Sequence, residues 1–201
     1  MLKITDPQAT KLDLATASIM VVSEKSIDQD ILAQMLMGFG VSSIQRIANI
    51  AGATAASRSE VFDLALIDSG QSECDGFALA EAIRRQNDPT LRQLPIVLIL
   101  GHVRPTDVVR ARDCGANLVL TKPFSPQILF DRILWIAQDH RKFIETTTYV
   151  GPDRRFKAFG PPLGTKGRRK DDLSATLGEA VGANLSQDAV DDFFAPKRVS
   201  V

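Results

Sequence analysis

The sequence predicts an α/β protein built on a doubly wound, five-stranded parallel sheet. Four short and mostly apolar segments cover residues 19–22, 62–67, 95–100 and 118–120. Runs that lack the alternation of a half-exposed strand are typical of strands buried on both faces of a parallel sheet. Segments with helical spacing of apolar residues lie between these runs, and strands that alternate with helices form βαβ units with right-handed crossovers.

The helical segments follow the strands in order. Apolar residues recur at helical spacing within residues 31–39, 77–85, 108–115 and 125–137. Gly40 follows the first segment, where a helix is expected to end, and Pro126 lies in the first turn of the last. A strand near residues 42–48 and a helix near 51–59 are weakly signalled and are placed by topology. The five successive strand–helix units match a flavodoxin-like sheet with strand order 2-1-3-4-5.

The composition argues against nucleic-acid-binding, disulfide-rich and membrane-spanning proteins. The chain has 201 residues, and Lys+Arg and Asp+Glu balance at 24 each, so no global field favours nucleic acid or an anionic membrane. Its two cysteines are too few for a disulfide framework. Its start carries no apolar signal segment, and no stretch approaches the roughly 18 consecutive apolar residues of a membrane span. We therefore expect a cytoplasmic protein with no membrane partner.

The chain is expected to divide into one folded domain and a long tail. A flexible leader covers residues 1–16, and the folded domain covers residues 17–146. A basic segment rich in Gly and Pro follows at 147–184, and it has too few apolar residues to offset the entropy of ordering it. We interpret it as a flexible, largely disordered tail. A short amphipathic helix is expected at 185–194, before a disordered end at 195–201.

The residues that close the apolar runs are expected to meet in one crevice, because the working site of a doubly wound sheet lies at the carboxyl ends of its strands. They are Ser23, Glu24, Asp68, Leu100, Gly101 and Lys122. Two carboxylates close together, here Glu24 and Asp68, favour a hard divalent cation such as Mg²⁺. Lys122 would neutralise an oxyanion bonded to one of them. An acid, Mg²⁺ and a lysine are the minimum apparatus for phosphoryl transfer to an aspartate.

Three motifs give the chain a family resemblance. They are DLALID at residues 63–68 followed by Asp75-Gly76, LPIVLI at residues 94–99, and Gly115-Ala116 leading to KPF at residues 122–124. In this order and spacing, residues 17–139 resemble the receiver domains of two-component response regulators, and the single-domain chemotaxis receivers among them.

The resemblance implies a phosphorelay function. Asp68 would be the phosphoryl acceptor, Lys122 would contact the phosphoryl group, and the backbone of Gly101 would line the phosphoryl loop. Mg²⁺ would be held by Asp68, by Glu24 from the first loop and by the backbone carbonyl of Gly70. The Lys122 to Pro123 bond would be cis. The phosphoryl donor would be a sensor histidine kinase or a phosphotransferase, and the output would be contact with a downstream protein.

Several positions depart from the family pattern. Ser23-Glu24 replaces the usual acidic pair after the first strand, so weaker Mg²⁺ binding is expected from the lower ligand charge. Leu100 replaces the Ser or Thr that hydrogen-bonds the phosphoryl group, and Val119 replaces the aromatic switch residue. Slow phosphorylation, a response by another route and no phosphorylation at all therefore remain open alternatives.

The amphipathic segment at residues 185–194 is predicted to bind a groove. Leu185, Val190, Phe193 and Phe194 would form one apolar face above acidic residues, after a serine cap. The segment resembles the N-terminal peptide of flagellar motor switch proteins, which docks on chemotaxis receivers. Docking on such a surface, folding back on the chain's own domain and an inert tail are the three alternatives.

The leading hypothesis is a response regulator that is not an enzyme and acts by protein–protein contact, in motility, chemotaxis or another bacterial signalling pathway. One alternative is a non-phosphorylated pseudo-receiver scaffold, which Ser23, Leu100 and Val119 favour. Another is a nucleic-acid-associated regulator that uses the basic tail, although the balanced charge makes nucleic acid a less favoured partner. A flavodoxin-like electron carrier is a weaker alternative, since the first loop lacks a phosphate-binding run of Ser, Thr and Gly.

Overall fold

Five parallel strands form the central sheet. The computed structural model describes residues 3–4, 12–69, 75–139, 141–154 and 186–194. The strands of the sheet are β3 (Ser18–Val22), β4 (Ser43–Ile47), β5 (Leu64–Asp68), β6 (Ile96–Leu100) and β7 (Leu118–Thr121). They are hydrogen-bonded in the order β4-β3-β5-β6-β7, and every pair is parallel. This is the predicted order 2-1-3-4-5, so the flavodoxin-like fold is confirmed.

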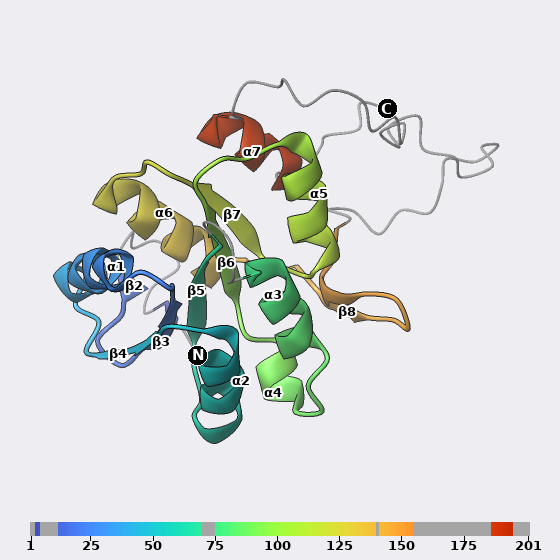
Figure 1. Cartoon of the computed structure of the whole chain (residues 1–201), viewed down its shortest axis with the longest axis horizontal. Helices are drawn as coiled ribbons and strands as arrows, with labels where there is room; N and C mark the ends of the chain where they lie inside the picture. The colour runs from blue at the N-terminus through green and yellow to red at the C-terminus, as the bar shows by residue number, and fades with distance from the viewer. Residues whose placement is uncertain (1–2, 5–11, 70–74, 140, 155–185, 195–201) are drawn as a thin grey trace.

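Helices cover both faces of the sheet (Figure 1). On one face lie α1 (Ser26–Gly38) and α6 (Pro126–Ala137). On the other lie α2 (Ile50–Ser59), α3 (Gly76–Arg84) and α5 (Pro105–Asp113), together with the short α4 (Pro89–Arg92), which the sequence analysis did not anticipate. In the ranges that the structure describes, none of the helices has both the length and the apolar character needed to cross a membrane.

The sheet divides the core in two, because alternate residues of a strand point to opposite faces. In β3, Met20 and Val22 belong to the cluster beneath α2, α3 and α5, while Ile19 and Val21 belong to the cluster beneath α1 and α6. All four side chains are buried. Uninterrupted apolar runs therefore predict β3, β5, β6 and β7, which are buried, whereas the edge strand β4 is more exposed and carries no such run.

Several helices begin at side-chain caps that the local sequence encodes. Asn49, Asp75 and Ser125 accept hydrogen bonds from backbone N–H groups in the first turns of α2, α3 and α6. Such caps satisfy N–H groups that have no partner inside the helix. After α1, Gly40 has a φ of 90°, which is the left-handed conformation expected where a helix stops.

The folded unit begins earlier than the sequence analysis predicts. Within the predicted flexible leader of residues 1–16, β1 (Lys3–Ile4) pairs antiparallel with β2 (Leu12–Asp13). Leu14 is only 1% exposed and packs in the cluster beneath α1 and α6. The leader prediction is wrong for these residues, because a two-residue strand and one buried leucine are too short to produce a periodic pattern.

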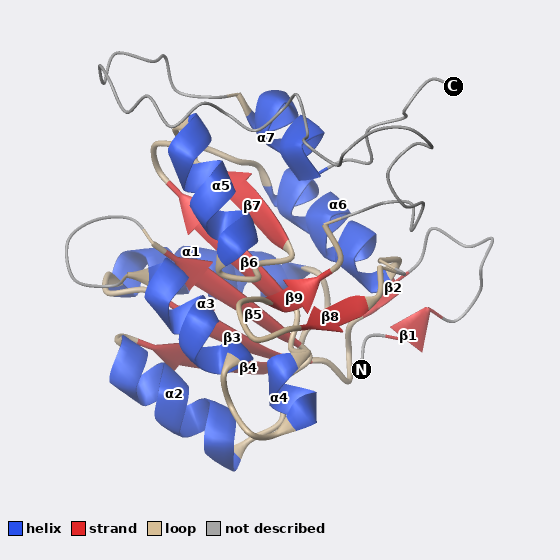
Figure 2. Cartoon of the chain, turned by 90° about the vertical axis from the view of Figure 1, so that its right-hand side faces the viewer, coloured by secondary structure: helices blue, strands red, loops and turns tan. Residues whose placement is uncertain are grey.

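A hairpin follows the last helix of the sheet. Its strands are β8 (Phe143–Glu145) and β9 (Val150–Pro152), and Figure 2 shows them beside the sheet. The hydroxyl of Tyr149 donates to the backbone oxygen of Pro152 at 2.7 Å, and Arg154 pairs with Asp113 at 2.7 Å. The prediction that a flexible tail begins at residue 147 is therefore wrong for residues 147–154. Gly151 and Pro152 in this stretch belong to a close-packed hairpin. Residues 155–184 of the predicted tail lie outside the described residues.

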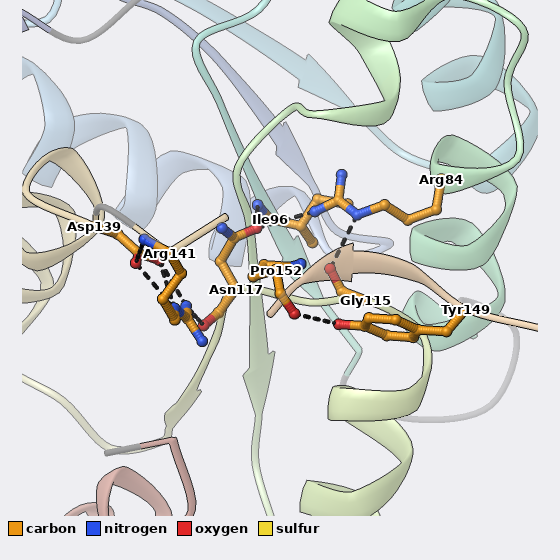
Figure 3. Close-up of polar contacts among 8 residues, drawn as sticks. All are labelled: Arg84, Ile96, Gly115, Asn117, Asp139, Arg141, Tyr149 and Pro152. Carbon is orange, nitrogen blue, oxygen red and sulfur yellow. Dashed lines mark hydrogen bonds and ion pairs between the residues drawn. The ribbon is translucent and has the colours of Figure 1, made fainter. Parts of the chain in front are cut away.

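A buried arginine joins α3 to the loops beneath the hairpin (Figure 3). Arg84 is 2% exposed. Its guanidinium donates to the backbone oxygens of Gly115 (3.0 Å), Arg92 (2.8 Å) and Leu94 (2.7 Å), and to Asn117 Oδ1 (3.0 Å). Burial lowers the pKa of Arg84 to about 10, so the group keeps its charge at neutral pH. The charge is solvated by protein oxygens in place of water.

A last helix, α7 (Gln187–Phe194), packs on the domain. It lies beside β7 and next to α5 and α6 in both views (Figure 1 and Figure 2). Val190 is 0% exposed and belongs to the same buried cluster as Val119. Of the three alternatives for this segment, the structure therefore has it folded back on the chain's own domain.

Candidate functional site

The carboxyl ends of β3, β5 and β7 bring three of the predicted site residues together. Ser23 follows β3, Asp68 is the last residue of β5, and Lys122 follows β7. Lys122 Nζ donates to Asp68 Oδ2 at 2.7 Å, and Ser23 Oγ donates to the same oxygen at 3.2 Å. The structure thus places these side chains in one pocket, as the topology of a doubly wound sheet predicts.

Asp68 is a buried carboxylate whose two oxygens differ. Its residue is 4% exposed, and Oδ2 accepts both hydrogen bonds of the pocket. Oδ1 is buried and has no hydrogen-bond partner among the residues that the structure describes. Buried polar atoms nearly always have a partner, so an orphaned oxygen in a pocket indicates a place for a ligand or a reacting group.

The electrostatics of the pocket favour a cation near Asp68. Burial raises the pKa of Asp68 above its ordinary value of 3.8, because a carboxylate is poorly solvated there. Lys122 opposes this increase through its hydrogen bond and its charge, and Ser23 opposes it through its hydroxyl. The negative charge of Asp28 adds to the increase. Positive charge brought into the pocket would therefore stabilise the ionised form.

Asp28, in the first turn of α1, is a second acid of the pocket that the sequence analysis missed. Its Oδ2 lies 3.3 Å from Lys122 Nζ, so one ammonium bridges Asp28 and Asp68. A sequence signal was present, because the first turn of a helix that begins just after a strand end faces the same crevice. Asp28 therefore brings a carboxylate close to Asp68, where the sequence pattern at Ser23 suggests that one is missing.

Glu24, the predicted second acid, is exposed. Within the described ranges, no hydrogen bond or ion pair joins its side chain to another residue, so its role as a Mg²⁺ ligand stays a prediction. The loop after β3 is held by Gln29, whose Nε2 donates to the backbone oxygens of Ser23 at 2.6 Å and Ile47 at 3.0 Å. Gly70, whose backbone carbonyl is the third predicted ligand, lies outside the described residues.

The side chains present fit a Mg²⁺ ion. This cation is commonly bound by one or two carboxylates and keeps several waters. Asp68 and Asp28 bring two carboxylates into the same pocket, where both lie within ion-pair distance of Lys122. In the described part of the chain, no group of three or more His, Cys, Asp or Glu side chains could hold a metal ion.

The strand ends of β6 and β7 carry the predicted departures. Leu100 and Val119 are buried apolar residues in the cluster beneath α3 and α5. The backbone oxygen of Leu100 accepts the backbone N–H of Lys122 at 2.8 Å, and the bond between Lys122 and Pro123 is cis, as the resemblance implies. Gly101 is exposed after β6, where a Cβ would have no atom within 4 Å. Neither Leu100 nor Val119 has a side-chain donor for a phosphoryl group.

The Asp75-Gly76 motif shapes the start of α3 beside Asp68. Asp75 caps the helix by accepting from the backbone N–H groups of its first turn. A Cβ on Gly76 would lie 2.8 Å from Ser69 Cβ and 3.0 Å from Ile67 Cγ2. Glycine therefore lets α3 begin against the end of β5, and this close approach is a structural reason for the motif.

The predicted docking residues lie in or next to α7. Val190 is buried, Phe193 and Phe194 belong to the helix, and Leu185 lies outside the described residues. Gln187, whose side-chain amide bonds to β7, is not among the predicted docking residues, because a polar side chain lies outside the apolar face that predicted them.

Comparison with known proteins identifies relatives of this chain. The family model of the response regulator receiver domain matches residues 19–134. The chain is 24% identical over 115 residues to the chemotaxis protein CheY of Pseudomonas aeruginosa. This aligned region covers 57% of the chain and 91% of that protein. Other relatives are far longer. The chain spans 7% of Histidine kinase 1 of Arabidopsis thaliana and 14% of the sensor histidine kinase CheAY of Helicobacter pylori.

Solved structures share the fold. The chemotaxis protein CheY4 of Vibrio cholerae aligns with a TM-score of 0.56 at 22% identity, covering 61% of this chain and 99% of that one. The receiver domain of the sensor histidine kinase PA1611 of Pseudomonas aeruginosa aligns with a TM-score of 0.54 at 24% identity, covering 61% and 98%. That structure holds a magnesium ion in its active-site cleft. The family match covers more than half of this chain and agrees with its strand order. The chain therefore belongs to the response regulator receiver domain family, the phosphoryl-accepting signalling domains of two-component systems.

Proposed function

We propose that this chain is a phosphorelay response regulator in which Asp68 accepts a phosphoryl group from a sensor histidine kinase or a phosphotransferase. One observation carries the proposal. Lys122 Nζ holds Asp68 Oδ2 at 2.7 Å, while Oδ1 is buried without a hydrogen-bond partner in the described part of the chain. The paired oxygen fixes the carboxylate, and the unpaired oxygen is free to form a bond.

The transfer is a displacement at phosphorus. A carboxylate oxygen of Asp68 forms the P–O bond of an acyl phosphate while the P–N bond of a phosphohistidine breaks, and the leaving imidazole takes a proton from solvent. Lys122 balances the charge of the phosphoryl oxygens through its ammonium group. Mg²⁺, held by Asp68, by Asp28 or Glu24 and by the carbonyl of Gly70, would neutralise further charge on those oxygens.

The output of this protein is proposed to be protein–protein contact. In the described part of the chain, the elements outside the sheet and its helices are the β1–β2 pair, the β8–β9 hairpin and α7. These are small elements that modify the surface of the receiver domain. We propose that this contact serves motility, chemotaxis or another bacterial signalling pathway.

The first experiment is intact-mass analysis after incubation with acetyl phosphate and Mg²⁺. The wild-type chain is expected to gain the mass of one phosphoryl group, and Asp68→Ala is expected to gain none. Asp88→Asn is the matched control, because this exposed residue caps α4 and asparagine caps a helix equally well. A mass gain that persists in Asp68→Ala would place the acceptor elsewhere.

A pseudo-receiver scaffold is the alternative function that a specific observation favours. Leu100 and Val119 are buried apolar side chains, so the residues that conventionally read the phosphoryl group are absent while the fold is intact. No mass gain in the wild-type chain, with a competent receiver labelled in parallel, would favour this alternative. Use of the basic tail for nucleic acid stays a prediction about residues outside the described ranges, and a steep salt dependence of binding would test it.

A further inference from the structure

We propose that α7 is a built-in ligand of the outer edge of β7, and that a phosphoryl group on Asp68 releases it. The trigger rests on the function proposed above. The docked state rests on contacts of its own, so the two parts are tested separately.

The polar contacts of α7 complete an open strand edge. β7 is the last strand of the sheet, and an edge strand leaves backbone N–H and C=O groups without a neighbouring strand. Gln187 Oε1 accepts from the backbone N–H of Thr121 at 2.6 Å and from its hydroxyl at 2.8 Å. Gln187 Nε2 donates to the backbone oxygen of Val119 at 3.1 Å. One side-chain amide thus pairs a donor and an acceptor two residues apart, as a neighbouring strand would.

Two further contacts hold the same helix. Gln187 Nε2 also donates to Asp191 Oδ1 at 2.8 Å, and Asp191 forms an ion pair with Arg132 of α6. Val190, one residue earlier, is 0% exposed and joins the buried cluster that contains Val119 and Val103. The helix is therefore placed by a buried apolar side chain and oriented by polar groups on either side of it. Such a combination specifies one docked geometry.

The docking contact adjoins the acid pocket. Thr121, whose N–H and hydroxyl both bind Gln187, is the residue before Lys122. Lys122 reaches Asp68 with its ammonium at 2.7 Å, and its own N–H is bonded to the backbone oxygen of Leu100 at 2.8 Å. One peptide unit therefore separates the group that contacts Asp68 from the group that holds α7. A change in the position of Lys122 reaches Gln187 without passing through Leu100 or Val119 side chains.

The direction of the response follows from geometry and charge. Lys122 bonds to Asp68 Oδ2, so its ammonium would turn towards the oxygens of a phosphoryl group bonded to Oδ1 and shift the end of β7 with it. The bonds of Gln187 to Thr121 and Val119 fit the unphosphorylated geometry and would weaken. The added negative charge would also repel the acidic residues of α7. Both effects favour release.

The covalent connection makes docking intramolecular. α7 and β7 belong to one chain, so docking of the helix is an intramolecular event that needs no second molecule. A separate protein that binds the same strand edge must displace α7. Phosphorylation would then expose the edge of β7 to such a partner.

The test is amide hydrogen exchange of residues 187–194 in the 201-residue chain, before and after treatment with acetyl phosphate and Mg²⁺, with intact mass measured on the same samples. Gln187→Glu keeps the length of the side chain and the helix propensity, but replaces the amide donor that faces Val119 and Asp191 by an acceptor. Asp188→Asn is the matched control, because it changes an exposed residue of the same turn.

In the untreated samples we expect wild type and Asp188→Asn to be protected and Gln187→Glu to exchange roughly tenfold faster, as the loss of a pair of hydrogen bonds implies. In the phosphorylated wild type, exchange should rise towards the rate of Gln187→Glu. Equal exchange in untreated wild type and Gln187→Glu would overturn the docked state. Protection that weakens on dilution would show that a second copy provides the helix, which would overturn the intramolecular contact.

The mass spectrum separates the two proposals. A phosphoryl mass gain without faster exchange of α7 would overturn the release mechanism and leave the phosphorelay function standing. Absence of a mass gain would overturn the phosphorelay function and its release step together. The comparison of Gln187→Glu with Asp188→Asn would still decide whether α7 is docked.

Discussion

At the scale of single residues, the ionised carboxylate of Asp68 is expected to destabilise the folded chain. Burial raises its pKa, so the folded state binds the proton more tightly than the unfolded chain does. The penalty is absent below the ordinary pKa of 3.8 and develops as pH rises through the folded-state pKa. Asp68→Asn should therefore raise the free energy of unfolding at pH 7 and leave it unchanged at a pH below 3.8. Urea denaturation across this pH range measures the difference.

Asp88→Asn is the control for this prediction, since it removes an exposed charge at a helix cap that asparagine preserves. Its stability should follow the wild type at every pH. A lower stability of Asp68→Asn at pH 7 would contradict the prediction, because it would mean that the hydrogen bonds from Lys122 and Ser23 outweigh the effect of burial.

Arg84 is a second residue whose environment predicts a measurable effect. Its guanidinium is the donor for three backbone oxygens and for Asn117 Oδ1, and the bonds to Gly115, Leu94 and Asn117 are buried. Arg84→Met would leave these acceptors with fewer partners, and an unsatisfied buried group costs about 1–3 kcal/mol. We expect a loss of about 3 kcal/mol or more in the free energy of unfolding, measured by chemical denaturation.

The neighbouring Arg85→Met is the matched control, because Arg85 is exposed and its ion pair with Glu81 is of the surface kind that contributes little. Similar losses for the two variants would show that the buried hydrogen bonds of Arg84 do not stabilise the fold. Arg84→Lys should lie between wild type and Arg84→Met, since an ammonium has fewer donors than a guanidinium.

At the scale of elements, the β8–β9 hairpin approaches the loop before β7 so closely that only glycine fits there. Gly115 has a φ of 81°, and a Cβ on it would lie 2.3 Å from the backbone oxygen of Val150. Gly115→Ala combines a left-handed backbone penalty of about 1–2 kcal/mol with displacement of the hairpin. We expect a loss of about 2 kcal/mol or more in the free energy of unfolding.

Gly40→Ala separates these two effects. Gly40 has a φ of 90°, and a Cβ on it would meet nothing within 4 Å. It therefore measures the backbone penalty alone, about 1–2 kcal/mol. If Gly115→Ala costs no more than Gly40→Ala, the hairpin either moves without loss or does not pack there.

At the scale of the whole molecule, the hairpin is part of the stable folded unit although it lies beyond the matched family region, which ends at residue 134. Gly151 and Pro152 are buried, and the ring of Phe143 lies 5.2 Å from the guanidinium carbon of Arg84. A chain that ends after residue 139 should therefore melt at least about 5 °C below one that ends after residue 154. Calorimetry of the two chains measures this, and equal melting temperatures would exclude a stabilising role for the hairpin.

The arrangement of the sheet and the position of the pocket could be predicted from the sequence. Strands buried on both faces must be apolar throughout, and the polar residues that end them, such as Asp68 and Lys122, must then lie along one edge of the sheet. These are consequences of local pattern and of the few topologies open to alternating strands and helices. They need no knowledge of which side chains touch.

Three features depended on contacts that no local pattern encodes. Asp28 lies in the pocket because of the rotation at which α1 begins. The hairpin after residue 140 is ordered by packing against Arg84. Gln187 bonds to a residue of β7 that is more than sixty positions away in the sequence. In each case the deciding contacts are hydrogen bonds, ion pairs or close approaches to residues elsewhere in the chain, which the segment's own sequence does not name. By itself, then, the sequence determined the sheet and the acid pocket, because buried strands and helices carry recognisable patterns of apolar residues. Only the tertiary structure decided which acid accompanies Asp68 and what covers the edge of β7, because those choices are made by polar contacts between distant residues.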